Sequence, residues 1–242
     1  MENKKRIIVY VICFILMIGV VLSLNILTPY KKNNYQLNMN IERNDNVTNP
    51  IKYSEIITKV RDEYNNDDIK GILEIVNADY IVPVLQGKDN DYYLNHDAYG
   101  KHNYMGSIYL DYRVNIDSSK KLLIYGHNSS NIDMPFKILE EFYDKDYYDN
   151  HKYVDLTTST TKKRYEIFSV YVEPTDYSYM NINFNNDDEY FDHLEKLKSK
   201  SMYDTGINIS KDDEILILQT CSTNKDYRNY QKKYLLIILR RV

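Results

Sequence analysis

The stretch EILILQTC, residues 214–221, is a short apolar run that stops abruptly at a cysteine. Four consecutive aliphatic residues precede Gln219, and the run is too short for a typical helix, so it predicts a buried strand. A second apolar run, KYLLIILRRV (233–242), follows after a polar connection. The end of the chain is therefore expected to consist of two neighbouring strands with Cys221 at the exposed end of the first.

Runs of the same kind recur upstream, separated by Asn- and Asp-rich turns. The complete set of expected strands is 69–76, 80–86, 106–113, 121–127, 152–158, 163–174, 214–221 and 233–242. Eight strands with few helices between them predict a closed or nearly closed β-barrel rather than a doubly wound sheet. Pro83 is expected at an edge or a bulge, because proline cannot donate a ladder hydrogen bond.

Three segments have helical rather than strand periodicity. Apolar residues recur at helical spacing over 53–64, where Ser54 is a possible N-cap. A short amphipathic helix is expected over 134–143. The segment 187–199 has acids in its first turn and lysines in its last, which complements the helix dipole. The domain is therefore mostly β with helical inserts.

The N-terminus indicates a membrane anchor. An apolar run at 7–27 follows a basic cluster, and 21 helical residues span about 30 Å, enough to cross a bilayer. The positive-inside rule places 1–6 in the cytoplasm and the rest outside. The polar segment 28–52 is expected to be an extracellular stalk, and 53–242 the folded extracellular domain. A cleaved signal peptide is the alternative, although no A-x-A-like site follows the run.

Composition narrows the class of protein. Of the 242 residues 43% are hydrophobic and 27% charged, and the formal net charge is -4. That balance suits a globular domain, and no block of Lys and Arg favours nucleic acid as a partner. The acid clusters Asp89/Asp91 and 187–189 lack the spacing of a calcium loop. We therefore expect no metal and no other cofactor.

The chain has two cysteines, Cys13 in the apolar run and Cys221. Cys13 is expected within the membrane anchor and Cys221 beyond the anchor's outer end, so the two are not expected to form a disulfide. Cys221 is then a lone exported thiol, which suggests a nucleophile. A thiol of ordinary pKa needs a partner that favours the thiolate. His127 is the preferred partner, because it also ends an apolar strand. The remaining histidines are expected to be solvated surface residues: His96, His102, His151 and His193.

Five segments, in this order and spacing behind the anchor, resemble the sortases and specifically class B. They are NADYIVPVLQGKDNDYYL (77–94), GSIYLDYR (106–113), YGHN (125–128), the helix at 187–199 and LQTC (218–221). The resemblance covers nearly all of residues 53–242. It implies an eight-stranded sortase-type barrel with a helix before the cysteine-bearing strand.

The resemblance also implies a cysteine transpeptidase. Cys221 would cleave a C-terminal sorting signal of an exported surface protein and hold the acyl part as a thioacyl-enzyme. His127 would protonate the leaving amine and then deprotonate the incoming one. The acceptor would be an amine of a cell-wall precursor, peptidoglycan or pilin. The enzyme would sit in the cell membrane by its single N-terminal helix, with the catalytic domain outside.

One family residue is absent from its expected position. Relatives carry an Arg at the start of the last strand, where it stabilises the oxyanion, and this chain has Tyr234 there. The possible substitutes are Arg228, Lys232 and Lys233. Arg228 is favoured, because a guanidinium suits an oxyanion better than an ammonium. Arg113 is expected to pair with a carboxylate instead.

Further residues near the cysteine are expected to line the substrate groove: Gln219, Thr220 and Tyr234. Two alternatives to a transpeptidase stay open. One is a cell-wall cysteine peptidase, although such folds usually place the cysteine at a helix start and before the histidine. The other is a sortase-like binding module that has lost catalysis, an alternative raised by the missing Arg.

Overall fold

The computed structural model describes residues 50–242, with side chains from residue 52 onward. The predicted cytoplasmic tail, anchor and nearly all of the stalk lie outside these residues. Within them, no helix combines the length and the apolar character needed to span a bilayer. The first described helix, α2 (Pro50–Tyr64), begins three residues before the predicted start. Proline suits a first helical turn, because its missing N–H would have no partner there anyway.

Eight strands form one closed barrel, which confirms the predicted fold class. Around the barrel they follow the order β1-β2-β3-β4-β7-β8-β6-β5, and β5 pairs with β1 to close it. Two pairs are parallel, β2 with β3 and β4 with β7. The strands are β1 (Ile69–Ile75), β2 (Tyr80–Leu85), β3 (Tyr109–Leu110), β4 (Lys121–Tyr125), β5 (Tyr153–Thr158), β6 (Lys162–Glu173), β7 (Ile215–Cys221) and β8 (Tyr234–Arg241).

Two predicted elements differ from the structure. The strand expected over 106–113 is only the two residues of β3, because the carboxylate of Asp111 accepts the N–H of Arg113 and starts a turn. The amphipathic helix expected over 134–143 is a 3₁₀ helix, η2 (Lys137–Tyr143). A short helix that was not predicted, α3 (Lys145–Asn150), follows it and is capped by Asp144.

Alternation along β7 and β8 divides their side chains between two cores. Residues of one parity point into the barrel, and those of the other parity pack outside it, beneath the helices. The inward set is Leu216, Leu218, Leu235, Ile237 and Leu239. The outward set is Ile215, Ile217, Leu236 and Ile238, with the partly buried Tyr234 against it. Cys221 shares the parity of Ile217, so it belongs to the outer face.

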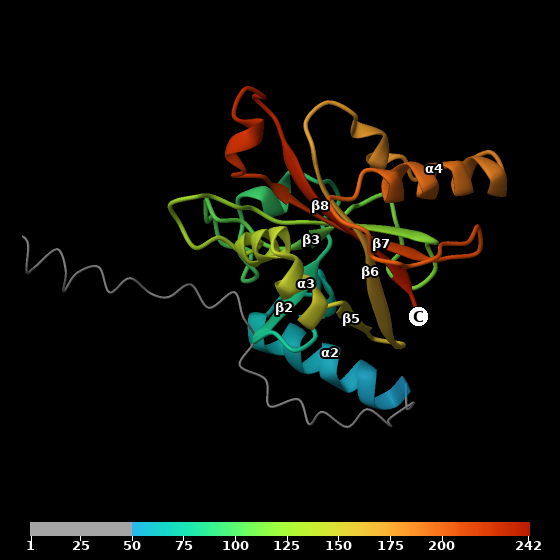
Figure 1. Ribbon diagram of the computed structural model, residues 1–242. Helices are drawn as coiled ribbons and strands as arrows, with labels where there is room; N and C mark the ends of the chain where they lie inside the picture. The colour runs from blue at the N-terminus through green and yellow to red at the C-terminus, as the bar shows by residue number, and fades with distance from the viewer. Residues whose placement is uncertain (1–49) are drawn as a thin grey trace, which may run out of the picture. The chain divides into compact units, whose positions relative to one another are not determined.

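Helices cover the outer face at separate places. Figure 1 shows α2 against β1 and β5, well apart from α4 (Asp187–Ser199), which packs near β6. The predicted bounds of α4 are confirmed, and Asn186 caps it by accepting the N–H of Glu189. Three short 3₁₀ helices lie in the connections: η1 (Tyr92–Leu94), η3 (Tyr177–Met180) and η4 (Lys225–Tyr227).

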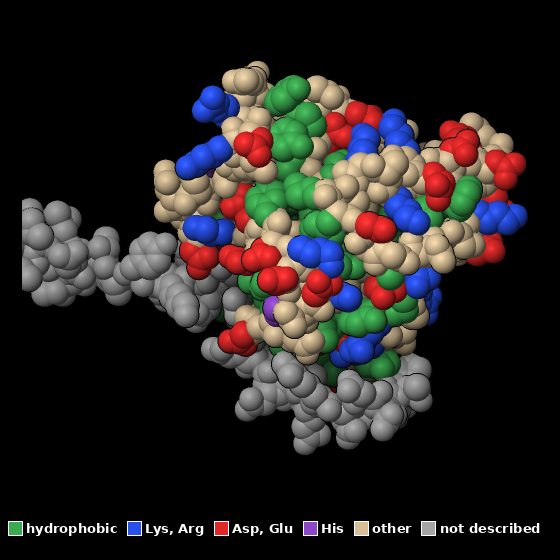
Figure 2. All heavy atoms as spheres, in the orientation of Figure 1, with side chains coloured by type: hydrophobic (Ala, Val, Ile, Leu, Met, Phe, Trp, Pro, Cys, Tyr) green, Lys and Arg blue, Asp and Glu red, His purple; other side chains and the backbone are tan. Residues whose placement is uncertain are grey.

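The surface carries mixed charge. In Figure 2, basic and acidic side chains alternate over the visible face, with apolar side chains exposed between them. Several of these charges are paired, as in the ion pairs from Lys200 to Glu173 and Asp176 at 2.5 and 2.7 Å. Because basic and acidic side chains are mixed on this face, its charge does not favour an anionic polymer as a ligand.

Candidate active site

The two predicted catalytic residues lie at the carboxyl ends of neighbouring strands. The last paired residues of the parallel strands β4 and β7 are Tyr125 and Gln219. His127 and Cys221 each follow two residues later, so they reach the same level and the same face. Neighbouring strands are separated by about 4.8 Å. Among the described residues no hydrogen bond joins the imidazole to the sulfur, yet the backbone places them side by side.

Three hydrogen bonds tie these strand ends together. The N–H of Gly126 donates to the Gln219 carbonyl at 3.1 Å, and the Thr220 hydroxyl donates to the Gly126 carbonyl at 2.8 Å. Beyond them, the side-chain amide of Asn128 donates to the carbonyl of Cys221 at 2.9 Å. The other amide atom, Oδ1 of Asn128, is buried and makes no hydrogen bond. Sequence reasoning quoted this Asn within YGHN but gave it no role.

The imidazole of His127 is oriented by a backbone carbonyl. Its Nε2 lies 2.7 Å from the Leu94 carbonyl oxygen in η1. A carbonyl only accepts, so Nε2 carries the proton, and Nδ1 is left available. Gly126, the residue before His127, allows a close approach between the backbone and a neighbouring ring. A Cβ there would lie 2.7 Å from the Phe136 ring, so no larger residue fits without movement.

Cys221 is a free cysteine, and the residue is exposed. Desolvation by the surrounding protein nevertheless raises its pKa above the ordinary value. The phenols of Tyr109 and Tyr234 lie close enough for their ionisation to be coupled to that of the thiol. At neutral pH the sulfur is therefore mainly protonated, and any thiolate is a minor population.

The chain just after the cysteine is fixed by its own hydrogen bonds. The N–H of Ser222 donates to the Lys233 carbonyl at 3.0 Å. The N–H and hydroxyl of Thr223 both donate to Glu140, at 2.8 and 2.5 Å. The N–H of Asn224 donates to the Ser222 hydroxyl at 3.2 Å. These three backbone donors are therefore engaged within the protein and are not free for an oxyanion.

Arg113 has the structural role that was predicted for it. Its guanidinium donates to the buried carboxylate of Asp111 at 2.9 and 2.7 Å, and the Tyr125 hydroxyl donates to the same group at 2.7 Å. Burial alone would raise the pKa of Asp111, but these hydrogen bonds hold it at about 2. The ion pair thus anchors the turn after β3 to the end of β4.

The candidate substitutes for the missing Arg lie in the connection between β7 and β8. Arg228 directly follows η4 as its C-cap, is exposed, and makes no side-chain hydrogen bond or ion pair within residues 50–242. Lys233 donates to the Tyr227 carbonyl at 3.2 Å, and Lys232 is exposed. Tyr234 lies directly opposite Cys221 in the antiparallel ladder. The position next to the thiol is therefore held by a phenol.

The two remaining groove residues have different placements. Gln219 lies on the outer face with Cys221, and its Oε1 accepts a hydrogen bond from the Tyr179 hydroxyl at 2.8 Å. Thr220 points the other way and is 1% exposed. Its hydroxyl binds the Gly126 carbonyl, so the structure gives Thr220 a role in joining the strands rather than a surface for substrate.

His193 is not the solvated histidine that was predicted. It is 8% exposed, and its Nε2 lies 2.7 Å from Nζ of Lys121. Desolvation and the neighbouring ammonium lower its pKa to about 3. Lys121 also donates to the carbonyls of Tyr179 and Asn181, at 2.7 and 2.6 Å. The imidazole is therefore a neutral acceptor in a buried cluster at the start of β4.

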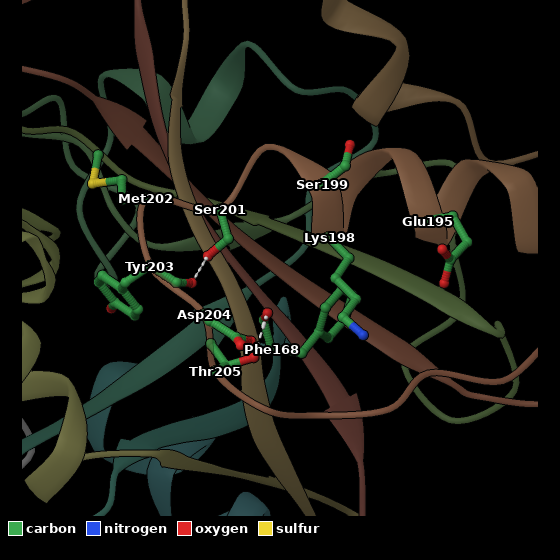
Figure 3. A pocket seen from close by; sticks show the side chains of 9 residues that line it. All are labelled: Phe168, Glu195, Lys198, Ser199, Ser201, Met202, Tyr203, Asp204 and Thr205. Atoms are coloured by element: carbon green, nitrogen blue, oxygen red, sulfur yellow. Dashed lines mark hydrogen bonds between the residues drawn. The ribbon is translucent and has the colours of Figure 1, made fainter.

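One cavity among the described residues lies in a part of the fold that does not include Cys221. It has a volume of about 420 Å³ and is lined by the C-terminal turns of α4, the segment 201–205 and Phe168 of β6. Figure 3 shows short hydrogen-bonded side chains there, including Ser201 bonded to the Tyr203 carbonyl. No predicted site residue lines this cavity.

Comparison with known proteins agrees with this arrangement. The sortase domain model matches residues 73–238. Sortase B of Listeria monocytogenes is 38% identical over 175 residues, which cover 70% of this chain and 71% of that protein. Among solved structures, a Cys-to-Ser mutant of Clostridium perfringens sortase B has a TM-score of 0.68 and 28% identity, covering 81% of this chain and 93% of its own.

A second solved structure, a sortase B complexed with triglycine, has a TM-score of 0.67 and 28% identity, covering 80% of this chain and 93% of its own. Both solved structures agree with the fold of this chain, and the family model and the curated relative agree with its sequence. The chain therefore belongs to the sortase family, and within it to class B, the cysteine transpeptidases that anchor surface proteins.

Proposed function

We propose that Cys221 attacks the scissile carbonyl of a C-terminal sorting signal on an exported protein and passes the acyl part to an amine of the cell wall or a pilin. The observation that supports this assignment is that His127 and Cys221 each lie two residues beyond the last paired residues, Tyr125 and Gln219, of the parallel strands β4 and β7. Cys221 is the last residue of β7, and hydrogen bonds between the two strand ends support the position of His127.

The steps use two protein groups. The thiolate of Cys221 forms a C–S bond, and the electrons of the carbonyl move to its oxygen. The oxyanion then collapses, the C–N bond breaks, and the imidazolium of His127 gives its proton to the leaving amine. The acceptor amine attacks the thioacyl group, His127 takes a proton from it, and the thiolate leaves.

The resting geometry suits this sequence. Because the Leu94 carbonyl holds Nε2, the proton exchanged in catalysis is the one on Nδ1 of His127. The raised pKa of Cys221 keeps most of the enzyme in the neutral thiol state. The active form is then a minor thiolate–imidazolium population, which needs no strong hydrogen bond between the two residues at rest.

Arg228 is our candidate for the family's missing cation. It follows Cys221 by seven residues, and within the described residues no partner holds its guanidinium. A free guanidinium in this connection is able to turn toward the scissile carbonyl when substrate is present. Replacement of Arg228 by Ala should then lower turnover more than the same change at Lys232 or Lys233. Near-full turnover of Arg228→Ala would remove this assignment.

The cellular setting follows from family and sequence together. Sortases are cell-surface enzymes of Gram-positive bacteria. We propose that the apolar run at 7–27 anchors this chain in the membrane and that residues 53–242 form the catalytic domain outside it. Protease digestion of intact cells should then remove the catalytic domain and leave a membrane-bound N-terminal fragment.

The activity is tested by product analysis on the full-length chain in detergent. The chain is incubated with a library of sorting-signal peptides, with and without triglycine, an amine suggested by the triglycine-bound relative. A peptide–triglycine product supports a transpeptidase. Free acid alone, even with triglycine, indicates a peptidase, and no product from any peptide indicates a binding module. Cys221→Ala should abolish the product, and Cys13→Ala, the matched control, should retain it.

A further inference from the structure

Tyr234 is the residue placed most directly against the thiol. It begins β8 and pairs with Cys221 across the antiparallel ladder. Side chains directly opposite in such a ladder lie on the same face, with Cβ atoms about 5 Å apart. The outward parity of both strands confirms that this shared face is the outer one, where substrate has access.

A neighbouring aromatic ring packs against the ring of Tyr234, but no described residue forms a hydrogen bond with its hydroxyl. The ring of Tyr177 in η3 lies edge-on, with centroids 5.9 Å apart. Tyr234 is half-buried, and within residues 50–242 its hydroxyl makes no hydrogen bond. A half-buried hydroxyl without a protein partner, next to a nucleophile, is a donor available to a ligand.

Other donors near Cys221 are committed elsewhere. The backbone N–H groups of Ser222, Thr223 and Asn224 all have acceptors. The side-chain amide of Asn128 is bound to the cysteine's own carbonyl. Arg228 lies in the connection after η4, whereas Tyr234 pairs with Cys221 in the ladder itself.

We infer that the hydroxyl of Tyr234 donates a hydrogen bond to the scissile carbonyl oxygen when Cys221 adds to it. The inference rests on the proposed function, since it needs Cys221 as the nucleophile. No proton leaves Tyr234: the carbonyl π electrons move to oxygen as the C–S bond forms, and they return when the C–N bond breaks. The phenol acts as a fixed dipole aimed at charge that develops in the transition state.

The surroundings favour the neutral donor form. Burial and the nearby thiol raise the pKa of Tyr234, so the phenol stays protonated at neutral pH. A phenol differs from an arginine in one measurable respect. It stabilises the oxyanion without adding a positive charge that would favour the resting thiolate. Its loss should therefore affect acylation and leave the acidity of the thiol nearly unchanged.

The test separates these two effects in Tyr234→Phe, which keeps the ring and removes only the hydroxyl. Single-turnover acylation of the full-length chain is measured with the library peptide that wild type cleaves best. The rate of Cys221 alkylation by iodoacetamide, a reaction with no oxyanion, is measured in parallel. Tyr177→Phe is the matched control, because Tyr177 shares the face but is not paired with the cysteine.

We expect Tyr234→Phe to slow acylation by about 100-fold, the usual effect of removing one oxyanion donor, with alkylation within twofold of wild type. The control should change neither rate by more than about twofold. Acylation slowed less than tenfold would overturn the inference, and so would an equal loss in both reactions, which would mean that Tyr234 acts on the thiol. If wild type alkylates normally but no peptide acylates it, the proposed function fails and the inference falls with it.

Discussion

The two ends of strand β4 differ in how their polar groups are satisfied. At its start Lys121 is 3% exposed, and its ammonium has three acceptors within 2.7 Å, two carbonyls and His193. Beyond its end, the imidazole of His127 has a single partner, and Oδ1 of Asn128 has none among the described residues. Each end has one histidine, yet only one of the two histidines faces a nucleophile.

We infer from this difference that the start of β4 contributes to stability and that its end contributes to catalysis. A buried ammonium is tolerated only when its donors are all satisfied, and the cluster around Lys121 meets that requirement. The opposite end keeps unsatisfied groups, which is costly in a folded protein unless a ligand uses them. We therefore expect substitutions at the start of β4 to weaken folding, and substitutions at its end to weaken catalysis.

The largest effect is expected for the histidine at the open end. His127→Ala removes the group that exchanges protons with both amines, so transfer to triglycine should fall by about 10²–10⁴-fold. The melting temperature should stay within about 2 °C of wild type. His193→Ala is the comparison, and it should show the reverse pattern. A loss of activity in His193→Ala as large as in His127→Ala would contradict the division between the two ends.

At the closed end, Lys121→Met leaves two buried carbonyls and the Nε2 of His193 without donors. Each unsatisfied buried acceptor costs about 1–3 kcal/mol, so the free energy of unfolding should fall by about 3 kcal/mol or more. Urea denaturation measures it. Lys120→Met, at the exposed neighbouring position, should cost less than about 1 kcal/mol. Equal stability of the two variants would show that the Lys121 cluster does not hold β4.

A smaller effect is expected for the amide clamp of Asn128. Asn128→Ala removes the bond to the Cys221 carbonyl and should slow acylation about tenfold, the equivalent of about 1.4 kcal/mol. Thr220→Val removes the neighbouring interstrand bond to Gly126, which points into the barrel. That variant should lose about 1 kcal/mol of stability and keep activity within about twofold. Identical behaviour of the two variants would mean that Asn128 is only structural.

The smallest effect is a shift in the pH dependence of the thiol. Desolvation raises the pKa of Cys221, so at a given neutral pH the folded protein holds less thiolate than an unfolded chain does. Alkylation of Cys221, followed by peptide mass mapping, should have its midpoint at higher pH in the folded protein than in urea. A midpoint below that of the unfolded chain would require a cation near the sulfur at rest.

Local sequence pattern was sufficient for most of the fold. The apolar runs of β7 and β8 are short, continuous and bounded by polar turns, so their limits were predicted to within a residue or two. The shortened β3 was missed, because the side chain of Asp111 competes for the backbone that a ladder would use. The strand-end positions of Cys221 and His127 were likewise readable from the apolar residues that precede them.

The sequence pattern alone could not predict contacts between residues that are far apart in the chain. His193 was expected to be a solvated surface residue, and only the fold brings Lys121, 72 residues earlier, against it. The hydrogen bond between Thr223 and Glu140 joins residues that are 83 positions apart. The Asn in YGHN was visible, but its bond to Cys221 depends on the pairing of two strands 93 residues apart.

The central claim is that Cys221 becomes acylated and passes its acyl group to an amine. It is tested most directly by trapping the full-length chain with the best library peptide, mapping the adduct by mass spectrometry, and then adding triglycine. We predict a thioester mass on the peptide that contains Cys221, absent in Cys221→Ala and discharged by triglycine. An adduct on any other residue, or one that persists in Cys221→Ala, would contradict the account.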